Sequence, residues 1–134
     1  MRILLSGALG RMGRAVAELC RERGVTVAAG VDVAPGREEL GFPVFPSFEA
    51  VTVKADVIID FTRPETLPEL LDHAIREKLP VVLATTGYNQ QDKSRIQKAA
   101  AEIPIFQSAN MSLGVSLLKS LVKQAAVVLG EDFD

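Results

Sequence analysis

The chain has 134 residues, of which 48% are hydrophobic and 24% charged, and its net charge is −2. These values are typical of a globular protein with one hydrophobic core, and the length leaves little room for a second domain. Acidic and basic residues are interspersed, so the sequence does not predict the basic face that nucleic-acid binding requires. The single cysteine, Cys20, can form neither an internal disulfide nor a thiolate metal site.

The start of the chain and its apolar runs bear on where the protein works. The first strand begins next to Met1, so we expect no signal peptide, and no apolar run is long enough to cross a membrane. A lone cysteine suits a reducing compartment. We therefore expect a cytoplasmic protein that contacts neither membrane nor nucleic acid.

Short apolar runs alternate with amphipathic stretches, which is the pattern of a parallel sheet covered by helices. Gly and Pro residues make most of 34–50 irregular. The predicted strands, in chain order, are 3–6, 25–31, a short one near 44–45, 56–60, 80–84 and 104–107. The predicted helices are 11–23, 62–78, 89–101 and 112–129.

Helix signals refine these segments. Gly24 ends the first helix, whose residues on one face are Met12, Ala15, Val16, Leu19 and Cys20. Thr62 and Glu65 have the spacing of a capping box for the second helix. That helix is expected to bury Leu67, Leu70, Leu71 and Ile75, and Pro68 leaves the start of its regular part undefined.

Residues at the other helix ends follow the same logic. Asn89 is the expected cap of the third helix. Ser112 opens the fourth, Gly130 ends it, and Glu131, Asp132 and Asp134 form a solvated acidic terminus.

A glycine-rich loop joins the first strand to the first helix, which is the context that gives such a motif meaning. Gly7 permits a tight turn, Gly10 lets the backbone approach a pyrophosphate, and Gly13 lets the helix pack closely on the strand. The N–H groups and dipole of the helix start favour an anion. A purely structural glycine turn is the alternative. The binding interpretation assigns the pyrophosphate of a dinucleotide to Gly7, Ala8, Leu9, Gly10, Arg11 and Met12.

Asp32 lies nineteen residues beyond Gly13, at the end of the second strand. An acid in this place accepts hydrogen bonds from the adenosine ribose hydroxyls, although a solvated loop acid is the alternative. The next residue, Val33, offers no charge to a 2′-phosphate, so NADH is favoured over NADPH. Arg11 or Arg37 could reach such a phosphate.

Three further segments follow strands and are expected at the same sheet edge, where ligands bind in open α/β sheets. They are 60–63 (Asp-Phe-Thr-Arg), 84–87 (Ala-Thr-Thr-Gly) and 108–112 (Ser-Ala-Asn-Met-Ser). Small hydroxyl and amide side chains suit the nicotinamide ribose and carboxamide, although each segment alone could be an ordinary loop. No catalytic acid–base pair or metal cluster is visible. The only histidine, His73, is expected on the helix surface.

Together these features predict a single-domain α/β protein of the Rossmann type. Its doubly wound, mostly parallel sheet has helices on both faces and the strand order 3-2-1-4-5-6. We therefore interpret residues 1–134 as one dinucleotide-binding domain.

The motifs GALGRMG, DFTRPE, ATTGY and SANMSLGV occur in order along the whole chain and resemble 4-hydroxy-tetrahydrodipicolinate reductases, also called dihydrodipicolinate reductases. The resemblance implies reduction of a cyclic dicarboxylate to tetrahydrodipicolinate by NADH or NADPH in diaminopimelate and lysine biosynthesis. It implies that the nicotinamide end is surrounded by Ala84, Thr85, Thr86, Ser108, Ala109, Asn110 and Met111.

This sequence departs from the family in two respects. Ala84 stands where the family usually has glycine. The family's substrate domain, with its His-His-x-x-Lys and Asp-Ala-Pro-Ser-Gly-Thr segments, has no counterpart here. We therefore expect a cofactor-binding half that contains no catalytic residue, binds a dinucleotide and does not turn over substrate. The full-length family is expected to be homo-oligomeric, and this chain monomeric. The alternatives are a stand-alone NAD(H)-sensing module and a CoA-binding Rossmann domain, against which Asp32 argues.

Overall fold

A computed structural model describes residues 1–33, 40–108 and 113–129 of the chain. Its centre is a six-stranded sheet in the order β3-β2-β1-β4-β5-β6, in which every neighbouring pair is parallel. This is the predicted order. The strands are β1 (Arg2–Ser6), β2 (Thr26–Val31), β3 (Val44–Phe45), β4 (Val57–Asp60), β5 (Val81–Leu83) and β6 (Ile105–Gln107).

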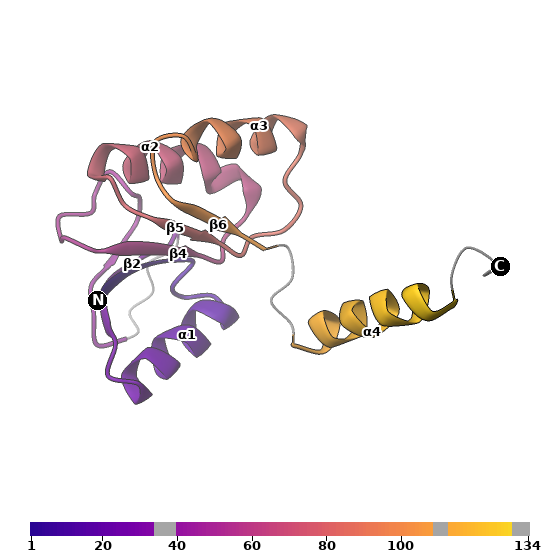
Figure 1. Ribbon diagram of the computed structural model, residues 1–134. Helices are drawn as coiled ribbons and strands as arrows, with labels where there is room; N and C mark the ends of the chain where they lie inside the picture. The colour runs from indigo at the N-terminus through magenta and orange to yellow at the C-terminus, as the bar shows by residue number, and fades with distance from the viewer. Residues whose placement is uncertain (34–39, 109–112, 130–134) are drawn as a thin grey trace.

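The helices cover both faces of this sheet (Figure 1), which confirms the doubly wound Rossmann architecture. Helix α1 lies on one face, and α2 and α3 lie on the other. The helices are α1 (Arg11–Glu22), the 3₁₀ turn η1 (Pro64–Thr66) that leads into α2 (Leu67–Glu77), α3 (Gln90–Ala99) and α4 (Leu113–Leu129).

The strand residues alternate between two hydrophobic clusters, one on each face. On the α2 and α3 side, Leu4, Ile58 and Leu83 are fully buried with Leu67 and Leu70 of α2. On the α1 side, Ile3 and Leu5 pack with Cys20 of α1. Because side chains alternate along a strand, residues two positions after Leu4, Ile58 and Leu83 also face α2 and α3.

The buried face of α1 differs from the predicted one. Gly13 and Cys20 are buried and Val16 packs beside them, whereas Met12 and Leu19 are 55% and 50% exposed. Ala15 is exposed as well. Because Gly13 lies in close contact with the strand-to-helix turn, the helix faces the sheet along the row of positions 13, 16 and 20. The prediction that Met12, Ala15 and Leu19 lie on the buried face of α1 was therefore wrong.

The predicted capping box at the start of the second helix was also wrong. Thr62 Oγ1 donates to the carboxylate of Asp60 at 2.6 Å, and no side chain caps η1 or α2. The Thr62 hydroxyl turns back to the charged acceptor at the end of β4, and the N-cap position of η1 is occupied by Arg63. Pro68 lies in the first turn of α2, where its missing N–H costs no helical hydrogen bond.

The prediction of a surface position for His73 was wrong. The side chain is 5% exposed and its ring lies 5.4 Å from the ring of Phe48, centroid to centroid. Arg76 Nη2 lies 2.9 Å from His73 Nδ1. Burial, and then the Arg76 charge, lower the pKa of His73. The segment after β3 covers this side of α2, which neighbours in the sequence cannot reveal.

Other local predictions were correct. Asn89 caps α3 through a reciprocal pair of hydrogen bonds with Asp92, at 2.9 and 3.1 Å. Gly24 follows α1 with a φ of +65°, a conformation that ends a helix readily only with glycine. Cys20 is buried, as expected for an inert core residue.

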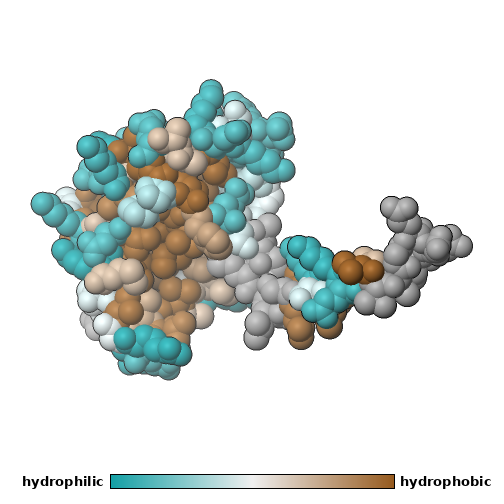
Figure 2. All heavy atoms as spheres, viewed as in Figure 1, coloured by the Kyte–Doolittle hydropathy of each residue, from teal (hydrophilic) through white to brown (hydrophobic). Residues whose placement is uncertain are grey.

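Helix α4 lies apart from the sheet and its covering helices (Figure 1). Several of its large hydrophobic side chains are more than half exposed: Leu117, Leu118, Leu121, Val122 and Val127. Figure 2 shows such hydrophobic residues on α4 beside hydrophilic ones. The predicted opening of this helix at Ser112, its end at Gly130 and the acidic terminus lie outside the described residues. Among the described helices, none has the length and apolar character needed to span a membrane.

Candidate nucleotide-binding site

The glycine-rich loop forms a tight turn fixed to the end of β2. Gly7 has a φ of +76°, and its N–H donates to Val31 O at 2.9 Å. The N–H of Gly10 then donates back to Gly7 O at 3.1 Å. A side chain at Gly7 would be strained by this φ and would lie 3.0 Å from Phe61 O. The turn therefore places the start of α1 directly beside the segment after β4.

Gly13 lets the helix approach this turn, as the motif predicted. A Cβ atom there would lie 2.1 Å from Gly7 O and 2.8 Å from the Cα and carbonyl carbon of Ala8. Gly30 in β2 has a similar role that sequence reasoning missed, since a Cβ there would lie 2.5 Å from the Ala8 Cβ. Glycine inside a strand often marks such a close approach, so the signal was present in the sequence.

The N-terminus of α1 offers donors for an anion. Gly10 is the N-cap and has no side chain to accept from the first turn. The backbone N–H groups of Arg11, Met12 and Gly13 have no acceptor within the residues that the structure describes. A Cβ at Gly10 would have only Gly7 O within 4 Å, at 3.3 Å, and the residue is exposed. The first turn of α1 is therefore open to a ligand oxygen.

Asp32 lies against the glycine loop from the end of β2. Its Oδ2 accepts a hydrogen bond from Leu9 N at 3.0 Å, and the residue is half-buried. Arg14 Nε donates to the carbonyl of the same Leu9 at 2.9 Å. Val33, directly after Asp32, is 86% exposed. The structure thus brings the predicted ribose acceptor and the predicted pyrophosphate loop into direct contact.

The segments after β4 and β5 reach the same edge of the sheet. Phe61 N donates to Ser6 O at 3.1 Å, and Ala84 N donates to Asp60 O at 3.0 Å. Ser108, after β6, donates its N–H to Leu83 O at 3.1 Å. Because these strands are parallel and adjacent, their carboxyl ends form one row next to the glycine loop.

Individual predicted residues differ in exposure along this row. Thr86 is exposed, Ala84 and Ser108 are half-buried, and Thr85 is buried with its hydroxyl turned toward Asp60. The predicted residues Ala109, Asn110 and Met111 lie outside the described residues, as does Arg37.

Sequence reasoning did not single out Asp60, although it quoted the segment that contains it. The carboxylate is 1% exposed and accepts from Thr62 Oγ1 at 2.6 Å and Thr85 Oγ1 at 2.7 Å. Tyr88 lies close by, and burial, followed by the charge of Asp60, raises the pKa of its phenol. The strand period could have found it, since Asp60 comes two residues after the buried Ile58.

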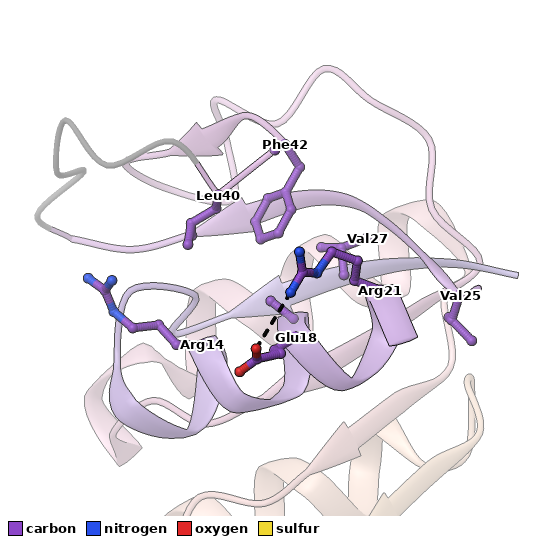
Figure 3. Close-up of a pocket in the computed structure, with 9 residues that line it drawn as sticks. Arg14, Glu18, Arg21, Val25, Val27, Leu40 and Phe42 are labelled. Atoms are coloured by element: carbon purple, nitrogen blue, oxygen red, sulfur yellow. Dashed lines mark ion pairs between the residues drawn. The ribbon is translucent and has the colours of Figure 1, made fainter. Parts of the chain in front are cut away.

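A groove of about 590 Å³ lies between α1, the start of β2 and the segment that leads into β3. Figure 3 shows Glu18 and Arg21 of α1 on one side of it and Leu40 and Phe42 on the other. The Glu18–Arg21 ion pair, 3.5 Å long, joins two exposed side chains and contributes little stability. Apart from their common helix, the groove shares no lining residue with the predicted site, so we do not assign the dinucleotide to it.

The sheet order, the glycine turn and the open helix N-terminus define a nucleotide-binding Rossmann domain. The family model described as dihydrodipicolinate reductase, N-terminus, matches residues 1–111. The chain therefore belongs to the dihydrodipicolinate reductase family. This membership does not favour the alternatives of a CoA-binding domain or a stand-alone sensing module.

Curated relatives match the whole chain. The 4-hydroxy-tetrahydrodipicolinate reductase of Caldanaerobacter subterraneus subsp. tengcongensis is 46% identical over 100% of this chain and 53% of its own length. The enzyme of the same name from Clostridium tetani is 39% identical over 100% of this chain and 52% of its own length. The chain thus spans about half the length of the curated relatives it matches.

Solved structures share the fold. A dipicolinate-bound dihydrodipicolinate reductase from Paenisporosarcina sp. TG-14 aligns with a TM-score of 0.75 at 24% identity, over 94% of this chain and 53% of that one. An oxidoreductase from Agrobacterium radiobacter in complex with NAD+, L-tartaric acid and magnesium aligns with a TM-score of 0.72 at 17% identity, over 94% of this chain and 41% of that one. At these identities the likeness concerns the Rossmann fold.

Proposed function

We propose that this chain is the NAD(P)H-binding domain of a reductase that converts 4-hydroxy-tetrahydrodipicolinate to tetrahydrodipicolinate in diaminopimelate and lysine biosynthesis. The observation that carries the binding function lies at the start of α1, beside Asp32. There, three backbone N–H groups have no acceptor among the residues that the structure describes. The reaction is supported by curated relatives that match the whole chain and are named 4-hydroxy-tetrahydrodipicolinate reductase. The bound cofactor supplies the hydride.

The residues at the sheet edge fit a dinucleotide. The first turn of α1 donates N–H groups to the pyrophosphate, and Gly10 leaves the space that this contact needs. Asp32 accepts from the adenosine ribose. The segments that contain Ala84 and Ser108 hold the nicotinamide end, together with Thr86, whose exposed side chain is open to a ligand.

NADH is the proposed preference over NADPH. Val33 beside Asp32 is exposed and uncharged, and the Asp32 carboxylate would repel a 2′-phosphate. We expect Val33→Arg to raise the affinity for NADPH more than that for NADH. A wild-type chain that already strongly prefers NADPH would show that a cation such as Arg11 or Arg37 binds the phosphate.

Calorimetric titration of the chain with NADH tests the binding function. Gly10→Val should abolish binding because its branched side chain occupies the proposed pyrophosphate position, while circular dichroism shows an unchanged fold. Asp32→Ala should weaken binding by roughly 1–3 kcal/mol through loss of the ribose acceptor. Ala15→Val, on the exposed side of α1, is the matched control and should bind as the wild type does. Normal binding by a folded Gly10→Val variant would remove the loop from the site.

The isolated chain is proposed to bind the cofactor without appreciable turnover. Hydride transfer needs a substrate held against the nicotinamide and a proton donor in reach of it. His73 does not meet this need, because it is buried in α2 against Phe48. An assay of NADH absorbance with freshly generated substrate checks this. Turnover at the rate of an ordinary dehydrogenase would contradict it.

A further inference from the structure

Three neighbouring strands, β1, β4 and β5, change from buried apolar to buried polar residues at or just beyond their carboxyl ends, on the same face of the sheet. Ser6, Asp60 and Thr85 each follow, by two residues, a buried residue of the cluster on the α2 and α3 side. Ser6 and Asp60 are register partners in β1 and β4. All three are at most 4% exposed. A buried polar layer therefore lies directly beneath the loops of the proposed site.

The centre of this layer is a buried charge held by neutral donors. Within the part of the chain that the structure describes, no lysine or arginine forms an ion pair with Asp60. Its Oδ1 accepts from Thr62 Oγ1 at 2.6 Å and Thr62 N at 3.3 Å, and its Oδ2 accepts from Thr85 Oγ1 at 2.7 Å. Burying a carboxylate is costly, so these hydrogen bonds are required to keep it in place.

The two oxygens hold two different loops. Oδ1 fixes Thr62 in the loop after β4, and Oδ2 fixes Thr85 in the loop after β5. The Thr85 hydroxyl also lies 3.0 Å from Thr62 O, so its single hydrogen is shared between the Asp60 carboxylate and the loop after β4. We propose that Asp60 is a positioning residue, which sets the spacing between these loops and so shapes the nicotinamide end of the site.

This inference rests on the proposed function, because it concerns the loops assigned to the nicotinamide. It makes a selective claim. The adenosine and pyrophosphate half is held by the glycine loop and Asp32, which make no hydrogen bond to Asp60. Weakening the contacts of Asp60 should therefore affect the nicotinamide half of the ligand alone.

The test compares NADH with ADP, which keeps the adenosine and pyrophosphate half of the ligand and lacks the nicotinamide and its ribose. Thr85→Val keeps the side-chain volume but removes the hydroxyl, and Thr85→Ser keeps the hydroxyl as a matched control. In Thr85→Val we expect NADH affinity to fall by about tenfold, because the loop after β5 loses its hydrogen bond to a charged group. The affinity for ADP should stay unchanged within about twofold. Thr85→Ser should bind both ligands as the wild type does. The fluorescence of bound NADH should change in the valine variant only.

Thr62→Val removes the other hydroxyl that donates to Asp60, and we expect the same selective loss of NADH affinity. Because Thr62 is only half-buried, this variant provides the test if Thr85→Val does not fold. Equal affinities of the valine variants and the wild type for both ligands would overturn the inference. So would a parallel loss of both affinities, because the polar layer would then support the fold as a whole. A wild-type chain that binds neither ligand would instead refute the proposed function.

Discussion

The tight contact of α1 with the glycine turn yields a sharp prediction for Gly13→Ala. The added methyl group would lie 2.1 Å from Gly7 O and 2.8 Å from two backbone atoms of Ala8. Neither contact involves a flexible side chain that could turn aside. The helix start, the glycine turn, or both must move, and the contact of α1 with the sheet is lost in part.

The expected loss of stability can be estimated from two opposing effects. Overpacking in a well-packed region costs about 1–3 kcal/mol, and a contact with rigid backbone at 2.1 Å belongs at the upper end. Alanine in place of glycine in a helix returns up to about 1 kcal/mol. The net loss is about 2 kcal/mol, which for a domain of this size lowers the Tm by roughly 6–10 °C.

Gly10→Ala is the matched control, three residues earlier in the same loop. Gly10 has φ −70° and ψ 166°, which alanine adopts freely, and the nearest atom to its Cβ would be 3.3 Å away. The Gly10→Ala variant should lose less than about 1 kcal/mol of folding stability, because alanine is a poorer N-cap residue than glycine. Thermal unfolding followed by circular dichroism measures both variants. Equal Tm values for the two, or a stabilised Gly13→Ala, would refute the packing argument.

Three further predictions concern stability and reactivity. Because His73 has a pKa below its ordinary 6.5 when folded, stability should fall as the pH drops below about 6.5, and His73→Gln should flatten that slope in urea titrations. Buried Cys20, whose thiol pKa is raised by burial, should react with iodoacetamide far more slowly in the folded chain than in urea, and equal rates would contradict its burial. Asn89→Ala should cost about 1 kcal/mol by removing the α3 cap, and an unchanged unfolding midpoint would show that this cap contributes nothing.

The sheet could be predicted because its signals are local. Each strand is a short apolar run bounded by glycine, proline or a helix cap, and the order follows from the Rossmann pattern. The structure shortens most strands by one or two residues, as in β5, where Pro80 and Ala84 lie outside the strand. The glycine turn was predictable for the same reason, since the residue types that it needs all lie within 7–13, although contacts with β2 and with the segment after β4 hold it in place.

The failures came from contacts between segments far apart in the sequence. His73 has charged and small neighbours in α2, but Phe48 covers it from another segment. The sequence predicted helix α4, but the signals at its ends could not show what its leucines would contact. The Thr62 prediction failed for a local reason, because the capping-box pattern does not consider the competing acceptor at Asp60.

The N-cap glycine of α1 has a consequence for the stability of the whole domain. Most helices complete their first turn with a Ser, Thr, Asp or Asn side chain from their own sequence, and this one does not. In the proposed function, the missing acceptor is a phosphate oxygen of the cofactor, so part of the helix cap is a diffusible molecule. Resistance to unfolding then depends on cofactor supply, and a hundredfold excess over Kd adds about 2.7 kcal/mol. A cell that runs short of the dinucleotide would, by the same coupling, leave more of this protein open to proteolysis.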